Sequence, residues 1–178
     1  MATPVVHIRG SDCCMGRSLV SRLIRSDVKI VIPEVDLQSF EKLFSTELIY
    51  SNSQLLNSEN TPIEQGHRVV LLGLGPFIGN AEQSSIGVDG SETILITPGF
   101  EKVEVDSSEI DSHLIINHMI ATACNDYWCC PILQNWYNAI SSEQNIESDP
   151  RPKHWWVSEM DVVDSIVRIL VSDLPFPK

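Results

Sequence analysis

The chain alternates between short apolar runs and longer stretches in which apolar and polar residues recur with a regular spacing. The short runs are rich in Val and Ile and are bounded by Gly, Pro, Asn or Asp, a pattern typical of buried strands. We predict strands at residues 5–8, 28–32, 47–50, 68–72, 93–96 and 128–133.

The regular stretches have the apolar spacing of one helix face. We predict helices at residues 17–25, 38–44, 109–123 and 160–171, and a polar loop at residues 141–153. The first strand, helix and second strand follow one another within about thirty residues, which is the unit that builds a parallel sheet. The sequence therefore predicts an α/β fold, with a doubly wound, mostly parallel sheet in a three-layer α/β/α arrangement.

Length and composition favour one globular domain over residues 1–178. Hydrophobic residues make up 43% of the chain and charged residues 20%, which suits a packed core. No apolar run is long enough to cross a bilayer, and the first residues lack the apolar segment of a secretory signal. We expect a cytoplasmic protein with no membrane partner.

The formal net charge of −12 is spread unevenly along the chain. Residues 31–150 are strongly acidic, whereas residues 1–30 carry a small excess of basic side chains. An acidic surface repels nucleic acid and anionic membranes, so we expect neither as a partner. The basic side chains of residues 1–30 still allow this part of the chain to bind a small phosphate group.

The five cysteines do not predict disulfides or a metal site. A chain without an export signal is expected to keep its thiols reduced. The adjacent pairs Cys13-Cys14 and Cys129-Cys130 lack the spacing of zinc ligands. His113 and His118 do not have the i, i+4 spacing that places two ligands on one helix face. We therefore interpret the cysteines as structural thiols.

A glycine-bearing turn joins the first predicted strand to the first predicted helix. Gly10 and Gly16 keep the outer positions of a G-x-x-G-x-x-G turn, Cys13 replaces the middle glycine, and the helix follows at Arg17. Backbone N–H groups of such a turn meet the pyrophosphate of a dinucleotide. The side chain of Cys13 takes up space where the backbone would approach the pyrophosphate, and the negative charge of Asp12 repels phosphate. The alternative interpretation is an ordinary strand-to-helix turn.

Glu34 lies about twenty positions beyond this turn, where an acidic residue can hydrogen-bond the adenosine ribose of a dinucleotide. A carboxylate favours NAD because it repels the 2′-phosphate of NADP. The positive charge of Arg17 has the opposite effect, because it attracts the 2′-phosphate of NADP.

Four segments, taken in their order along the chain, resemble those of a known enzyme family. They are residues 6–23, which include the glycine turn, residues 69–75, which include Gly73, residues 129–137 and residues 154–168. Together they resemble the extended short-chain dehydrogenase/reductases, the family of NAD-dependent nucleotide-sugar epimerases and dehydratases. The resemblance implies a Rossmann-like fold that binds NAD, with NADP less favoured, and places Gly73 on the strand that passes the nicotinamide ribose. It also implies a nucleotide or nucleotide-sugar ligand, and a homodimer formed through the helix at residues 109–123.

The chain departs from this family at the catalytic residues. The family uses a Tyr-x-x-x-Lys pair, in which the Lys lowers the pKa of the phenol. None of the three tyrosines has a lysine four residues later. That position holds Gln54 after Tyr50, Pro131 after Tyr127 and Ser141 after Tyr137. By order along the chain, the nearest equivalents of the family's catalytic groups are Thr97, His113 and Asn117. His113 also fits as a plain helix residue, and the substrate-binding part is reduced to about residues 139–153.

Three hypotheses follow. In the first, the chain is a catalytically degraded relative that keeps the scaffold for a nucleotide-binding, regulatory or partner-subunit role, with NAD binding weak or lost. In the second, it is an active oxidoreductase or epimerase that uses Thr97 and His113. In the third, it is a structural or interaction protein whose glycine turn holds no cofactor. Trp136, Trp155 and Trp156 either stack a base or sugar ring or fill the core.

Overall fold

The computed structural model describes residues 3–73, 90–100, 110–121, 128, 130–146 and 156–176. Six parallel strands form one sheet in the order β3-β2-β1-β4-β5-β6, and a short second sheet pairs β7 with β8. The strands of the large sheet are β1 (Val5–Arg9), β2 (Lys29–Ile32), β3 (Gln54–Asn57), β4 (Arg68–Leu72), β5 (Glu92–Pro98) and β6 (Ser112–Ile116). The small sheet contains β7 (Met119–Ile120) and β8 (Val157–Ser158). This order is that of a doubly wound Rossmann-like α/β fold.

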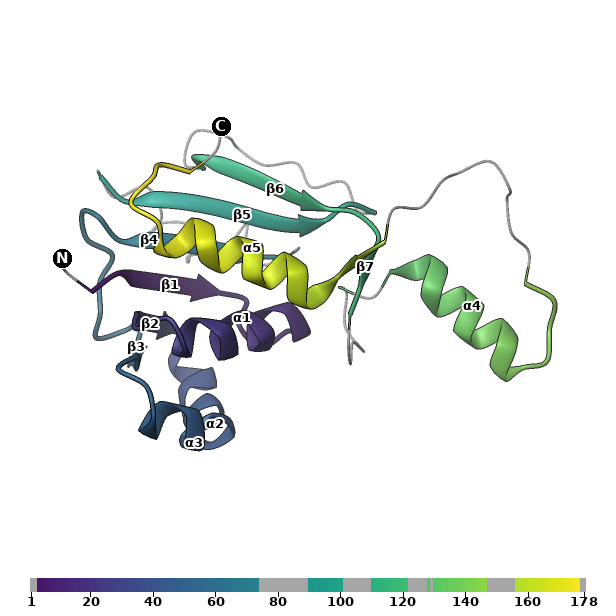
Figure 1. The fold of residues 1–178 in the computed structure, drawn as a ribbon, viewed down its shortest axis with the longest axis horizontal. Helices are drawn as coiled ribbons and strands as arrows, with labels where there is room; N and C mark the ends of the chain where they lie inside the picture. The colour runs from purple at the N-terminus through teal and green to yellow at the C-terminus, as the bar shows by residue number, and fades with distance from the viewer. Residues whose placement is uncertain are drawn as a thin grey trace.

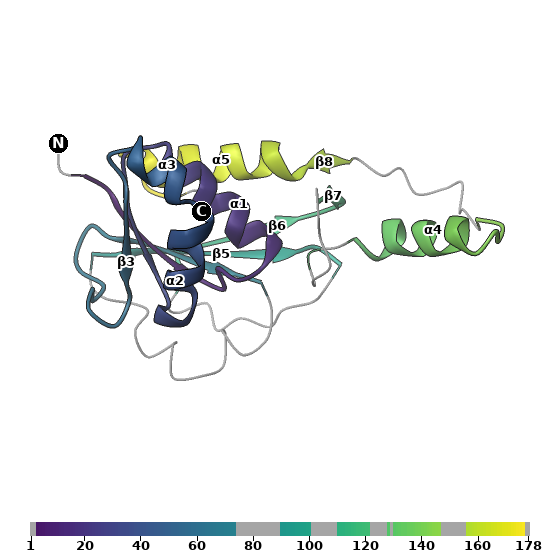
Figure 2. The same cartoon turned by 90° about the horizontal axis from the view of Figure 1, so that it is seen from below.

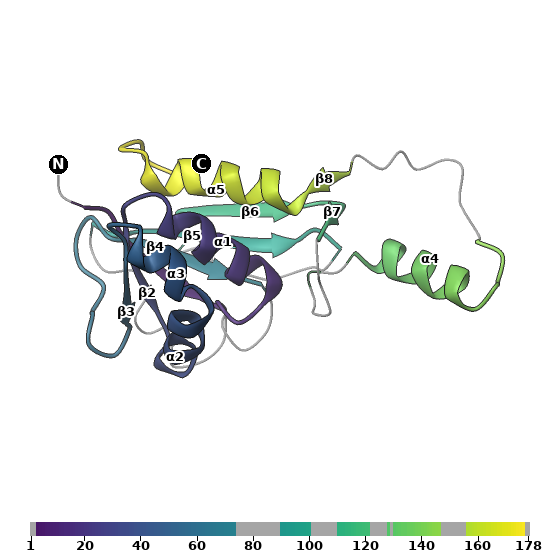
Figure 3. The ribbon, with the colours of Figure 1, turned by 60° about the horizontal axis from the view of Figure 1, so that its bottom comes forward.

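The helices are α1 (Cys14–Ile24), α2 (Glu34–Leu43), α3 (Ser45–Ile49), α4 (Pro131–Ser141) and α5 (Glu159–Val171). Helices α1 and α5 lie side by side over one face of the large sheet (Figures 1 and 3). Helices α2 and α3 lie beside the β3 edge (Figure 2). Helix α4 stands apart from the sheet in all three views. No described helix is long and apolar enough to cross a membrane.

The two faces of the large sheet bury different side chains because successive residues of a strand point to opposite sides. Alternate residues of the central strands, such as Val6 and Ile8 of β1, join the main core with α1 and α5. The opposite face has a smaller apolar cluster built on Val69, Leu71 and Leu95. That face also buries polar groups of β1 and β5; they are His7, Arg9, Thr93 and Thr97.

Most of the predicted elements are confirmed. The strands at residues 5–8, 28–32, 68–72 and 93–96 correspond to β1, β2, β4 and β5. The helices at residues 17–25, 38–44 and 160–171 correspond to α1, α2 and α5, each of which begins earlier than predicted. The fold class is therefore the one that the hydrophobic pattern predicts.

The helix predicted at residues 109–123 is wrong. Its described part, residues 110–121, contains β6 and β7 instead, and β6 pairs in parallel with β5. Aliphatic residues lie close together here, so the apolar run fits a strand as well as a helix. Hydrogen bonding to the exposed edge of β5 decides for the strand. Residues 109, 122 and 123 lie outside the described part.

Two strands were predicted in places where the structure has helices. Residues 47–50 belong to α3 and its end, and the third strand follows at β3. Of residues 128–133, the last ones open α4, with Pro131 at the start of the helix, where its missing N–H costs nothing. The predicted loop at residues 141–153 begins as α4 ends, but residues 147–153 lie outside the described part.

Candidate functional site

Strands β1 and β4 are neighbours at the point where the strand order reverses. In open α/β sheets, ligands bind at the carboxyl ends of the strands at such a point. Gly10 follows β1 with φ of 78°, and Gly73 follows β4 with φ of 88°. A Cβ atom on Gly10 would lie 2.6 Å from the carbonyl oxygen of Leu72, so the glycine turn packs directly on the end of β4. The two glycines of the sequence prediction therefore meet at the expected edge.

The side chain of Cys13 closes the glycine turn from the inside. Cys13 is the N-cap of α1 and only 3% exposed. Its Sγ atom accepts a hydrogen bond from the Gly16 backbone N–H at 3.3 Å and donates one to the Gly10 carbonyl at 3.1 Å. A thiol therefore satisfies one of the N–H groups at the helix start that a phosphate would otherwise meet.

Gly16 has a packing role in the same turn. A Cβ atom at this position would lie 2.3 Å from the carbonyl oxygen of Ser11. The absence of a side chain therefore lets α1 approach the end of β1 closely. This is the role that the last glycine of a dinucleotide-binding turn has in helix–strand packing.

The charged groups around the turn are mostly bound to the turn itself. Ser11 Oγ donates a hydrogen bond of 2.7 Å to the Asp36 carboxylate in the first turn of α2. The Arg17 guanidinium donates to the Asp12 carbonyl at 2.9 Å. The Arg17 side chain is thus bound to a backbone carbonyl of the turn, and the negative charge of Asp12 in the same turn opposes phosphate.

Two carboxyl groups lie beyond the carboxyl ends of β2 and β3. Glu34 is exposed and begins α2 directly after Pro33, and Glu59 is exposed just beyond β3. A side-chain hydrogen bond with Glu34 and the negative charge of Glu34 raise the pKa of Glu59 above its ordinary value. The pair offers acceptors for ribose hydroxyls and repels a further phosphate charge.

Thr97 and His113 lie in contact. Thr97 Oγ1 and His113 Nε2 are 2.8 Å apart, although the residues come from different strands. Thr97 is buried near the end of β5, and burial lowers the pKa of the more exposed His113. A neutral imidazole that is hydrogen-bonded to a hydroxyl can accept its proton, which is the arrangement of a nucleophile and its general base.

Asn117 is placed differently from the other two predicted catalytic residues. It follows β6, and its Oδ1 atom lies over Gly99, where an added Cβ would be only 1.8 Å away.

Gly73 connects the glycine turn with the end of β5, because its N–H donates to the Ile96 carbonyl at 2.8 Å, next to Thr97. The predicted residues thus lie at the carboxyl end of the sheet, except His113, which lies opposite Leu95 near the start of β6.

Sequence reasoning missed the polar pair on β1. His7 is fully buried, and its Nε2 atom lies 3.0 Å from His67 Nδ1. Burial, with the nearby positive charges of His67 and Arg9, lowers the pKa of His7 to about 4. Arg9 lies two residues further along the same strand and immediately precedes Gly10. The signal was the alternation of residues 5–9, which puts both polar side chains on the face opposite Val6 and Ile8.

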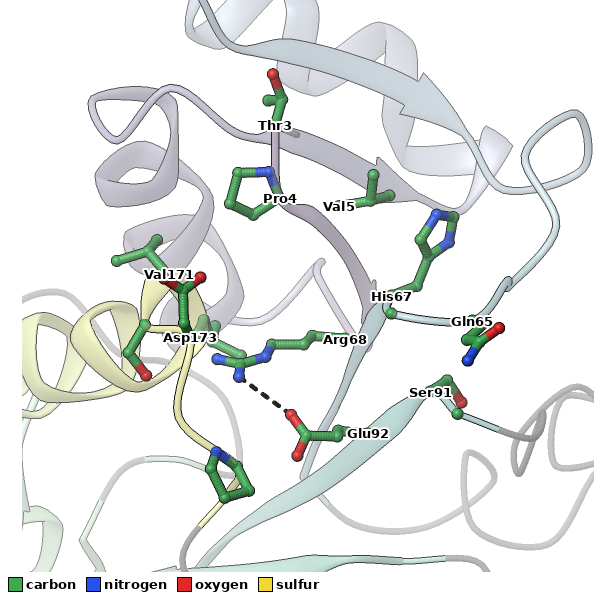
Figure 4. Close-up of a pocket in the computed structure, with 15 residues that line it drawn as sticks. Thr3, Pro4, Val5, Gln65, His67, Arg68, Ser91, Glu92, Val171 and Asp173 are labelled. Carbon is green, nitrogen blue, oxygen red and sulfur yellow. Dashed lines mark ion pairs between the residues drawn. The ribbon is translucent and has the colours of Figure 1, made fainter. Parts of the chain in front are cut away.

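The larger of the two described cavities lies at the other end of the sheet. It has a volume of about 780 Å³ and is lined by the starts of β1, β4 and β5 and by the chain after α5. Figure 4 shows Arg68 in this cavity, directed at Glu92, with which it forms an ion pair of 3.1 Å. Arg68 also binds the Ile169 carbonyl. This cavity therefore lies far from the strand ends where the fold places ligands, and its main charge is already paired.

Comparisons with protein-family models, curated proteins and solved structures found no match. Among the described residues there is no group of three or more His, Cys, Asp or Glu side chains that could hold a metal ion. The resemblance to the extended short-chain dehydrogenases thus rests on the four sequence segments and stays a prediction.

Proposed function

We propose that the chain is a nucleotide-binding domain related to the extended short-chain dehydrogenases that has lost the family's acid–base chemistry. The observation that supports it best is the meeting of Gly10 and Gly73, both at positive φ, where the strand order reverses. The missing Tyr-x-x-x-Lys pair supports the loss of turnover. Its role is then binding, regulation or partnership with an active subunit.

The proposed ligand is NAD, held weakly and in preference to NADP. Glu34 suits the adenosine ribose because its carboxylate is exposed directly after β2. The pyrophosphate fits less well, because Cys13 Sγ already accepts the Gly16 N–H and Asp12 adds a negative charge. Binding should therefore be much looser than in an active dehydrogenase.

The test is thermal unfolding with millimolar NAD or NADP. A ligand at about 100 times its dissociation constant stabilises a fold by about 2.7 kcal/mol. NAD should raise the melting temperature more than NADP, and Glu34→Ala should reduce the NAD shift. Glu41→Ala is the matched control, since Glu41 is exposed on the same helix. Absence of any shift with either cofactor would favour a structural or interaction protein.

The contact between Thr97 and His113 favours a second candidate, an active oxidoreductase or epimerase with unorthodox residues. Thr97 would bind the reacting oxygen and His113 would take the proton. The assay follows NAD(H) absorbance with several nucleotide sugars. Under this candidate, Thr97→Val and His113→Ala abolish turnover, while Thr97→Ser, which keeps the hydroxyl, retains much of it. Background rates in the wild-type protein would remove the candidate.

A further inference from the structure

A second cavity lies on the outer side of α1, between the junction of α2 with α3 and the start of α5 (Figure 3). Its volume is about 280 Å³. The lining consists of three arginines and two serines of the α1 segment and of three apolar residues from α2, α5 and the α2–α3 junction. Every lining residue belongs to residues 3–73 or 156–176, two stretches that the structure describes without a gap.

Positive charge gathers around this cavity, although the chain has a net charge of −12. The guanidinium groups are those of Arg17, Arg22 and Arg25, and α1 contains no acidic residue. Arg22 forms an ion pair with Asp164 on α5. Arg17 donates to the backbone carbonyl of Asp12, and neither Arg17 nor Arg25 forms an ion pair with a described carboxylate. Two guanidinium charges beside the cavity are thus left without a described counter-charge.

The stability of α1 explains only one of these two charges. Arg25 is the C-cap, where the negative end of the helix dipole favours a cation. Arg17 lies in the first turn, where the positive end of the dipole disfavours one. An anion bound in the cavity would compensate Arg17 and would find a second donor in Arg25.

The side of α1 between these two arginines offers a further donor. Ser21 lies one helical turn from each of them and lines the cavity. Its half-buried hydroxyl has no hydrogen-bond partner among the described residues. Glu159, which precedes Met160 in α5, is buried and accepts a hydrogen bond from Ser18. The described lining therefore offers hydrogen-bond donors and no carboxylate.

The other wall of the cavity is apolar. Leu43 and Met160 contribute side chains that are 58% and 48% exposed, beside the buried Phe44. An inorganic ion would leave these surfaces in water, whereas an apolar group attached to the anion would cover them, which is favourable. The cavity therefore suits a molecule with one charged end and one apolar end.

We propose that this cavity is a binding site for a phosphate monoester with a small apolar group. The phosphate lies between Arg17, Ser21 and Arg25, and the apolar group lies against Leu43 and Met160. A phosphate monoester carries a charge of about −1.5 to −2 at pH 7, which matches the two uncompensated guanidinium groups. A volume of about 280 Å³ is near the lower end of the range for small-molecule sites.

The ligand is small because the rest of the chain is acidic. Nucleic acid and anionic membranes extend beyond the cavity, where the net charge of −12 repels them. A molecule that fits into the cavity meets the local positive charge directly, while salt screens exposed acids that lie more than about 8–10 Å away.

Nuclear magnetic resonance titration of the isotope-labelled whole chain tests the proposal with two probes, phenyl phosphate and inorganic phosphate. Phenyl phosphate should shift the resonances of Ser21 and Arg25. It should bind about tenfold more tightly than inorganic phosphate, because its ring covers apolar surface. Equal affinities for the two probes, or no shifts on α1 at about 10 mM phenyl phosphate, would overturn the proposal.

Two variants separate the charged part of the site from the apolar part. Arg25→Gln should weaken the binding of phenyl phosphate by about tenfold, because a charge-assisted hydrogen bond is lost. Leu43→Ser should remove most of the advantage of phenyl phosphate and leave the affinity for inorganic phosphate unchanged. Both residues are exposed, so neither change should unfold the chain.

Arg168→Gln is the matched control, because it removes the same charge from an exposed arginine of α5 outside the cavity. It should leave the affinity for phenyl phosphate unchanged; an equal loss in Arg25→Gln and Arg168→Gln would reduce the effect to net charge and contradict the site. Arg25 and the glycine turn lie at opposite ends of α1. The NAD-induced change in melting temperature should therefore be the same in Arg25→Gln as in the wild type, so this proposal and the proposed NAD binding fail independently.

Discussion

Gly10, Cys13 and Gly16 have different tasks in the turn after β1. Gly10 supplies a backbone conformation at φ of 78° against the end of β4, and Gly16 allows α1 to lie against Ser11. Cys13 caps the helix with its thiol. Only the substitution at Cys13 removes a group that a dinucleotide-binding turn would offer.

Restoring glycine at this position should therefore strengthen nucleotide binding. In Cys13→Gly, the Gly16 N–H loses its thiol partner and becomes available to phosphate. The variant should lose about 1–2 kcal/mol of stability, because a cap and a buried side chain are removed. Calorimetric titration with NAD measures the affinity, with Cys13→Ser as the control that keeps a cap. Unchanged affinity in Cys13→Gly would mean that the thiol does not limit binding.

His7 predicts a pH dependence of stability. Its pKa is about 4 in the fold and ordinarily 6.5, so the unfolded chain binds the extra proton between these values. Above about pH 6.5, His7 is neutral in both the folded and the unfolded chain, so stability is highest there. As the pH falls from 6.5 to 4, the unfolded chain takes up the proton and the fold does not, so the free energy of unfolding decreases. At about 1.4 kcal/mol per pH unit the loss is at most about 3.5 kcal/mol. Urea unfolding at several pH values should show a flatter dependence for His7→Val, and equal slopes would contradict the assignment.

Helices α1 and α5 are joined by polar contacts as well as by the core. Arg22 binds Asp164 at 2.9 Å, and Ser18 Oγ donates to the buried Glu159. These contacts hold the start of α5 over the glycine turn's helix. The N-terminus of α5 is capped by Ser158, whose Oγ accepts the Asp161 N–H at 3.1 Å.

The Ser158 cap should be worth about 1 kcal/mol of stability. In Ser158→Ala an N–H at the helix start loses its partner, and chemical denaturation measures the resulting decrease in the free energy of unfolding. Ser165→Ala is the control, because the Ser165 hydroxyl only donates to the carbonyl of Asp161 one turn earlier, a contact that adds little to a helix. If the two variants lost equal stability, the cap would not be the cause.

At the scale of the whole molecule, the two ends of the large sheet carry different groups. The carboxyl end carries the glycine turn and Thr97, which contacts His113 from the start of β6. The amino end is closed by the chain after α5, which Arg68 holds. Its guanidinium binds Glu92 and the carbonyls of Ile169 and Leu174, and lies 4.9 Å from the Phe176 ring centroid.

Loss of Arg68 should release this C-terminal segment. We expect Arg68→Ala to cost on the order of 3 kcal/mol, since it removes the ion pair with Glu92, the hydrogen bonds to the Ile169 and Leu174 carbonyls and the contact with the Phe176 ring. Limited proteolysis should then cut near residues 172–176 faster than in the wild type. Arg168→Ala, an exposed arginine on α5, should leave the cleavage rate unchanged. Equal cleavage rates for wild type and Arg68→Ala would show that Arg68 does not anchor the segment.

The sequence by itself determined the parts that local patterns specify. A buried run followed by a glycine turn and an amphipathic stretch predicts β1, α1 and β2, and the same reasoning predicts β4, β5 and α5. It also named Thr97 and His113 as candidate catalytic residues, with His113 on a helix at residues 109–123 that is not formed. The structure brings the two side chains into contact from strands β5 and β6, and their catalytic role stays a prediction.

Tertiary structure decided what depends on distant residues. Residues 112–116 have an apolar run compatible with either element, and only the free edge of β5 makes them a strand. The thiol cap of Cys13 needs the observed turn geometry, and the contact of His7 with His67 joins β1 to the chain before β4. Periodicity reports which side of an element is buried, because burial follows the local repeat of the backbone. It does not report which distant group lies there, because that depends on how the strands pair.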